Sequence, residues 1–97
     1  MTIAHLRTYT INKGMMDSWL QKFQELIPVM AEHGIKVEST WVNDEGTQFI
    51  WIRSYGDAVE NIETAEAGFY GSEYWVANVD EVRSHLAHRE IVQIESI

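Results

Sequence analysis

The sequence predicts an α+β domain in which helices cover one face of a four-stranded antiparallel sheet. Two observations favour this class. Four stretches alternate in side-chain character with the period of two that is typical of strands, and between them apolar residues recur every three or four positions, as in helices. The order is strand, helix, strand, strand, broken helix, strand. The 97 residues suffice for one domain, so residues 1–97 are treated as a single unit.

The first predicted strand spans about Thr2–Ile11. Its alternate residues His5, Arg7 and Tyr9 share one face, because successive side chains in a strand point to opposite faces. The other face carries smaller apolar residues and threonines.

A helix is predicted after the next turn and continues to about His33, where Gly34 can adopt the left-handed conformation that ends it. Its spacing of three and four indicates one buried stripe. The stripe consists of Met16, Trp19, Leu20, Phe23, Leu26, Ile27 and Met30.

The next two strands are predicted at Ile35–Val42 and Gln48–Tyr55, joined by the tight-turn sequence Asn43–Gly46. They form an antiparallel hairpin. One face of the second carries large aromatic rings and an arginine, namely Phe49, Trp51, Arg53 and Tyr55. Such a contiguous patch is too apolar to remain exposed to water.

The second helical region begins with the capping-box spacing of Asp57–Glu60, with Val59 expected to point inward, and is interrupted by Gly68 and Gly71. Ser72 can cap a second segment. The last strand is predicted at about Arg89–Ile97.

This order is the ferredoxin-like βαββαβ plan. Both helical regions must cover the same face, because two crossovers of the same hand return to one side. The other face is then expected to be the one carrying Arg7, Tyr9, Trp51 and Arg53. Two copies that pack these faces together would close a dimeric α/β barrel, whose interior is filled by side chains or holds one small ligand.

Composition excludes several classes of function. The net charge is −8 with no basic cluster, so nucleic-acid binding is not expected. There are no cysteines, which removes disulfides and thiolate chemistry. No apolar run is long enough to span a membrane, and no export signal is evident. A soluble cytoplasmic protein without membrane partners is expected.

Several segments of the chain follow the pattern of one known family. They are Leu6–Ile11 followed by Gly14, Trp19 and Phe23, then His33–Ile35, Trp41 before the turn ending at Gly46, Trp51–Tyr55, Ser72–Trp75, and Arg89 with Glu90. In these segments the chain resembles the NIPSNAP family, a group similar to the dimeric α/β-barrel superfamily. The resemblance covers nearly the whole chain. It implies the fold and a homodimer, and it implies little chemistry.

The predicted ligand-binding residues are Arg7, Tyr9, Phe49, Trp51 and Arg53. Two arginines in a small cavity would hold a carboxylate or phosphate, and the aromatic rings would pack on its apolar part. Alternatively, a carboxylate of the protein neutralises each arginine, since a buried charge needs a partner. The candidates are Glu38, Glu90 and Glu95 on neighbouring strands.

His5 and Tyr9 are the candidate catalytic residues, with His5 as a general base or an inert histidine at the barrel mouth. Glu81, His85 and His88 have a helical spacing that could bind a metal, but a solvated helix face is the preferred interpretation. Glu60, Glu63 and Glu66 likewise indicate a solvated flank. No metal and no cofactor are expected.

Three functions remain open. The first is a homodimer that binds a small, partly apolar and anionic molecule inside its barrel. The second is a cofactor-free monooxygenase or isomerase, suggested by the superfamily alone. The third is a protein-interaction module with a solid interior. An open cavity beside Arg7 and Trp51 would favour the first.

Overall fold

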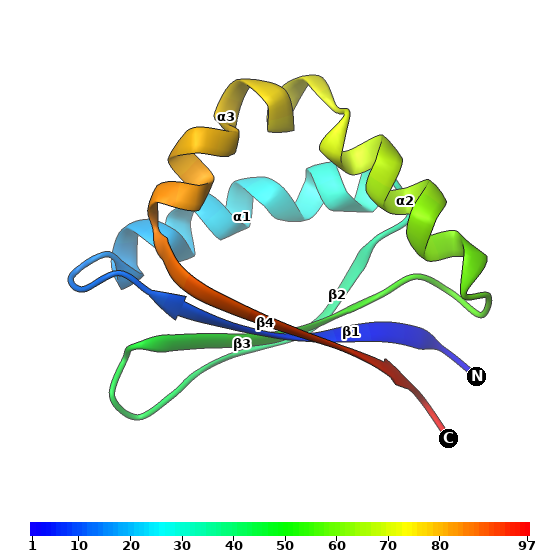
Figure 1. The fold of residues 1–97 in the computed structure, drawn as a ribbon, viewed down its shortest axis with the longest axis horizontal. Helices are drawn as coiled ribbons and strands as arrows, with labels where there is room; N and C mark the ends of the chain where they lie inside the picture. Colours follow the sequence, from blue (N-terminus) through cyan, green and yellow to red (C-terminus); the bar gives the residue numbers. More distant parts are fainter.

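The computed structural model describes residues 1–97 and has the predicted architecture. Four strands form one antiparallel sheet in the order β2-β3-β1-β4, and three helices lie on one side of it (Figure 1). This is a ferredoxin-like α+β fold. Its elements are β1 (Ile3–Ile11), α1 (Met16–Glu32), β2 (Lys36–Val42), β3 (Gln48–Ser54), α2 (Glu60–Tyr70), α3 (Glu73–Ser84) and β4 (Leu86–Glu95). No helix is long and apolar enough to cross a membrane.

The second helical region is broken at Gly71, as predicted, but Gly68, which was also expected to interrupt it, lies inside the continuous helix α2. The helix α3 begins with a side-chain cap. The Ser72 hydroxyl accepts a hydrogen bond from the Trp75 backbone N–H at 3.2 Å. The predicted capping box is wrong. The helix α2 begins at Glu60, Val59 occupies the capping position without a side-chain bond, and Val59 is 48% exposed rather than buried.

The last strand begins three residues earlier than predicted, at Leu86. The helix α3 ends at Ser84 and only His85 separates it from β4. The extra residues pair with the end of β1, where Leu86 lies opposite Ile11 across a register shift. Pairing with the long central strand therefore extends β4 beyond what its own apolar pattern indicates.

The helices cover the face that was expected to stay bare. The rings of Phe23 and Phe49 lie 4.7 Å apart, and those of Phe23 and Trp51 lie 4.8 Å apart, so α1 packs on the aromatic side of β3. Arg7 and Arg53 are 3% and 2% exposed beneath the helices. The large rings on this face offer more apolar area to the helical stripes than the opposite face does, which explains why the assignment was wrong.

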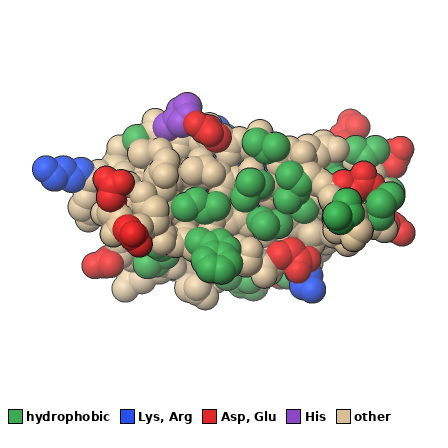
Figure 2. All heavy atoms as spheres, turned by 90° about the horizontal axis from the view of Figure 1, so that it is seen from below, with side chains coloured by type: hydrophobic (Ala, Val, Ile, Leu, Met, Phe, Trp, Pro, Cys, Tyr) green, Lys and Arg blue, Asp and Glu red, His purple; other side chains and the backbone are tan.

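The sheet face away from the helices is apolar and has no cover. Figure 2 views this face and shows hydrophobic side chains gathered near its middle. Register places six large apolar residues there, namely Leu6, Trp41, Ile50, Ile52, Val92 and Ile94. Trp41 is 64% exposed and Val92 is 53% exposed. Both faces of the sheet are thus poorly suited to water.

Candidate functional site

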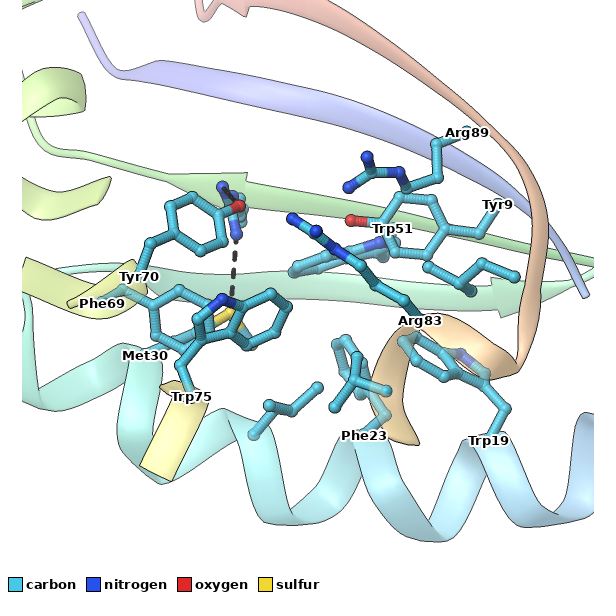
Figure 3. A pocket seen from close by; sticks show the side chains of 14 residues that line it. Tyr9, Trp19, Phe23, Met30, Trp51, Phe69, Tyr70, Trp75, Arg83 and Arg89 are labelled. Atoms are coloured by element: carbon cyan, nitrogen blue, oxygen red, sulfur yellow. Dashed lines mark hydrogen bonds between the residues drawn. The ribbon is translucent and has the colours of Figure 1, made fainter. Parts of the chain in front are cut away.

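A cavity of about 30 Å³ lies between the helices and the sheet (Figure 3). Eleven of the 14 residues that line it are hydrophobic, and the three others are all arginines. The arginines are Arg53, Arg83 and Arg89; the hydrophobic residues are Tyr9, Trp19, Phe23, Leu26, Met30, Trp51, Phe69, Tyr70, Trp75, Val82 and Leu86. No carboxylate faces this space, so its only charged groups are cations.

Beside the cavity, one carboxylate joins two buried guanidinium groups. Glu66 on α2 accepts from Arg53 Nη2 at 2.7 Å and from Arg7 Nη2 at 3.3 Å through the same oxygen. The Tyr55 hydroxyl donates to that oxygen at 2.9 Å. Arg53 also donates to the hydroxyls of Tyr55 at 2.6 Å and Tyr70 at 3.1 Å. The two arginines are therefore paired internally.

The partner is none of the carboxylates expected from the neighbouring strands. Glu38 instead accepts from Ser54 at 2.6 Å, and Glu90 lies 3.6 Å from His88. Glu66 was expected in a solvated flank, and that expectation is wrong because its side chain is only 27% exposed. The sequence did contain a signal for the burial of Glu66. It lies four residues from both Ile62 and Tyr70, and this spacing places it on the side of α2 that faces the core.

The network holds its groups in fixed protonation states. Burial raises the pKa of Glu66, but the hydrogen bond from Tyr55 and the charges of Arg53 and Arg7 outweigh it, so the pKa lies below the ordinary value. Burial raises the pKa of the Tyr55 hydroxyl. Glu66 stays ionised and Tyr55 stays neutral over a wide pH range.

His5 belongs to this network and does not line the cavity. Its Nδ1 lies 3.3 Å from Arg7 Nη2 and 3.0 Å from the Tyr55 hydroxyl. An arginine N–H can only donate, so Nδ1 carries the lone pair and the ring proton is on Nε2. Burial, followed by the charges of Arg7 and Arg53, lowers the pKa of His5. This arrangement suits a neutral histidine whose Nδ1 accepts a hydrogen bond from Arg7, because the Tyr55 hydroxyl gives its single proton to Glu66.

Three of the five predicted ligand-binding residues line the cavity: Tyr9, Trp51 and Arg53. Arg7 lies behind Tyr9 and donates to its hydroxyl at 2.8 Å. Phe49 is buried in the aromatic core against α1. Tyr9, one of the two candidate catalytic residues, is thus the one that reaches the cavity wall.

Sequence reasoning did not place Arg83 and Arg89 at the site. Arg83 comes from α3, and its guanidinium carbon lies 5.8 Å from the centre of the Trp75 ring. Arg89 comes from β4, directly opposite Tyr9 across the β1–β4 pairing. Neither has a carboxylate within 4.0 Å. The strand register brings Arg89 here, and the sequence alone does not show that register.

The predicted solvated group of Glu81, His85 and His88 does not lie on one helix face. His85 is 2% exposed, with Nδ1 2.8 Å from the Glu81 carbonyl oxygen and Nε2 2.8 Å from the Ser18 hydroxyl. His88 lies in β4 and is exposed. His85 therefore joins the start of α1 to the junction of α3 and β4, and the expectation of a solvated face is wrong for it.

Known structures share the fold. A NIPSNAP family protein from Agrobacterium tumefaciens superposes with a TM-score of 0.88 at 19% identity, covering 100% of this chain and 94% of that chain. An uncharacterised NIPSNAP domain protein from Burkholderia xenovorans gives 0.85 at 19% identity, with coverages of 98% and 94%. An antibiotic biosynthesis monooxygenase gives 0.67 at 13% identity and covers 98% of both chains. These likenesses show the fold.

No curated protein matches the sequence. The sequence pattern of the NIPSNAP family matches residues 4–94, which includes every strand and helix described above apart from the first and last residues of the sheet. The resemblance noted in the sequence is thereby confirmed, and the chain belongs to the NIPSNAP family.

Proposed function

We propose that the protein binds a small, partly apolar, anionic molecule in the cavity between the helices and the sheet. The observation that carries this proposal is the distribution of charge. All four arginines of the chain lie at or directly behind this cavity, with Glu66 as the single carboxylate bonded to them, although the net charge is −8. Such a local excess of positive charge attracts an anion.

The walls suit an apolar ligand body. Phe69, Tyr70 and Trp75 pack edge-to-face or tilted around the inner space, with ring centres 5.1 Å apart in each pair. The 30 Å³ cavity has room for one or two waters, so a ligand with a ring must displace part of the lining. Arg83 and Arg89 are exposed and long, and they can move without disturbing the core.

We further propose that the protein is a homodimer held together by the uncovered sheet face. Exposed apolar residues on this face, such as Trp41 and Val92, support a second copy of the chain as the partner. A two-fold dimer would bury the same apolar patch on both copies. In this arrangement the ligand cavity lies under the helices of each copy rather than inside the barrel.

The ligand proposal is tested with 8-anilinonaphthalene-1-sulfonate, whose fluorescence rises in an apolar site. Val82 lines the cavity and is 2% exposed, whereas Val76 on the same helix is 66% exposed. We expect the parent and Val76→Phe to bind the probe saturably, and Val82→Phe to bind it at least about tenfold more weakly because the added ring fills the space. Equal binding by the folded Val82→Phe variant, or no binding by the parent, would refute the proposal.

A cofactor-free oxygenase or isomerase in the same cavity is the second candidate. It is supported by Tyr9, whose hydroxyl accepts from Arg7 at the cavity wall and keeps its own proton to donate. Turnover of a bound aromatic compound by the parent and its loss in Tyr9→Phe would establish this candidate over simple binding.

A further inference from the structure

The cavity opens to solvent through a rim that includes Arg83, Leu86 and Arg89. These three residues line both the inner space and a neighbouring open hollow, whose other lining residues are Ala87 and His88. Figure 3 shows the side chains of Arg83 and Arg89 extending toward the middle of the site from α3 and β4. A molecule that enters from this hollow meets the two guanidinium groups first.

The inner arginines have little capacity left for a ligand. Arg7 does not line the cavity, and its Nη atoms donate to Tyr9, His5 and Glu66. Arg53 donates through Nε and Nη2 to tyrosine hydroxyls and to Glu66. Its Nη1 has only the Met30 sulfur, at 3.9 Å. An anion bound at this depth would compete with the Glu66 carboxylate and lose its hydration.

The two arginines at the rim, Arg83 and Arg89, still have their hydrogen-bonding capacity free for a ligand. No carboxylate neutralises either one, and the Trp75 ring positions the Arg83 guanidinium at the opening. An anionic group bound between them keeps part of its contact with water while it gains charge-assisted hydrogen bonds. The apolar side of the opening continues inward over Trp75 and Phe69.

We infer that Arg83 and Arg89 form the anion subsite and that the ligand binds with its charge outward and its apolar body inward. The ligand class is a monoanionic amphiphile whose acidic group stands at one end, such as an aryl-substituted carboxylic acid. This inference rests on the proposed function, and it moves the anion from Arg7 and Arg53, where the sequence placed it, to two residues on α3 and β4.

The test compares 3-phenylpropionate with its neutral amide by isothermal titration calorimetry, because the two share one apolar body. For the parent, we expect the acid to bind about tenfold more tightly than the amide, as charge-assisted bonds predict. The variants Arg83→Gln and Arg89→Gln should each lose most of this preference while binding of the amide changes less than about twofold. Arg83→Lys should recover part of the preference, since it restores the charge without the fork.

Lys36→Gln is the matched control, because Lys36 lies on the opposite edge strand and is 76% exposed. It should keep the preference of the parent. If Arg83→Gln and Arg89→Gln both keep the full preference for the acid, the anion sits elsewhere and the inference is overturned while ligand binding stands. If neither compound binds the parent although the fluorescent probe does, the assigned ligand class is wrong. If none of the three binds, the proposed function fails as well.

Discussion

At the scale of single residues, the central feature is one carboxylate that serves two buried cations. The guanidinium groups of Arg7 and Arg53 are nearly inaccessible to water, and Glu66 is the only carboxylate within 4.0 Å of either. Desolvating an arginine is costly, and the cost is tolerable only when a counter-charge and hydrogen bonds replace water. Glu66 therefore holds α2 on the sheet as well as neutralising charge.

Replacing Glu66 with Gln should destabilise the protein by about 3 kcal/mol, because two buried guanidinium groups lose their counter-charge. Urea denaturation at pH 7 measures the change. Glu63→Gln on the exposed side of the same helix is the control and should change the free energy of unfolding by less than about 0.5 kcal/mol. Equal stability of the two variants would show that the ion pairs contribute nothing net.

The lowered pKa of His5 makes stability depend on pH. His5 is neutral in the fold and has an ordinary pKa of 6.5 when unfolded, so the unfolded chain binds the extra proton first as the pH falls. Its contribution to stability is complete above the ordinary pKa and is lost below it, as protons bind the unfolded state. Glu66, whose pKa is lowered from 4.5, adds a loss of the same sign at lower pH.

Urea denaturation between pH 7.5 and pH 5 should therefore show the parent losing stability, and His5→Gln should show a smaller slope. His88→Gln removes a histidine whose side chain is 65% exposed and should retain the slope of the parent. A slope in His5→Gln equal to that of the parent would mean that another group titrates in this window.

At the scale of elements, the break between α2 and α3 determines the shape of the cavity. Gly71 ends α2, and Ser72 starts α3 in a new direction with its hydroxyl on the Trp75 N–H (Figure 1). Trp75 and Phe69 thereby lie on either side of the break with ring centres 5.1 Å apart. The cap positions both a cavity wall and the ring on which Arg83 stacks.

Ser72→Ala should lower stability by about 1 kcal/mol, which is typical for loss of a helix cap. Ser72→Thr should retain most of it, since its hydroxyl can both accept from the Trp75 N–H and donate to the Phe69 carbonyl oxygen as serine does. Thermal denaturation followed by circular dichroism measures both. A parent-like midpoint for Ser72→Ala would show that the tertiary contacts of Trp75 fix the start of α3 without the cap.

At the scale of the whole molecule, the sheet has one face covered by helices and one apolar face left open. A chain of 97 residues buries a modest share of its surface, so a second copy on the open face would add the burial that a small core lacks. The cavity and the proposed dimer surface lie on opposite faces of the sheet, so ligand binding and association can be tested separately.

Trp41→Glu should weaken self-association by more than about tenfold, because it places a charge in the apolar patch that the proposed dimer would desolvate. Sedimentation velocity over a range of concentrations measures this. Val76→Glu, on the exposed side of α3, is the control and should associate as the parent does. A parent that stays monomeric at all concentrations would contradict the dimer proposal.

Patterns in the amino-acid sequence correctly predicted the order of the elements, the helix break at Gly71, the Ser72 cap and the burial of Arg7, Trp51 and Arg53. These features depend on local periodicity, on turn chemistry and on the free-energy cost of exposing large rings to water. All three can be judged from the sequence of one chain.

The folded chain was needed to show which face the helices cover, that Glu66 neutralises the inner arginines, and that Arg83 and Arg89 reach the cavity. These features could not be predicted because they depend on contacts between segments far apart in the sequence. Helix packing chooses between two apolar faces by their total contact area, and strand register sets which side chains meet across the sheet.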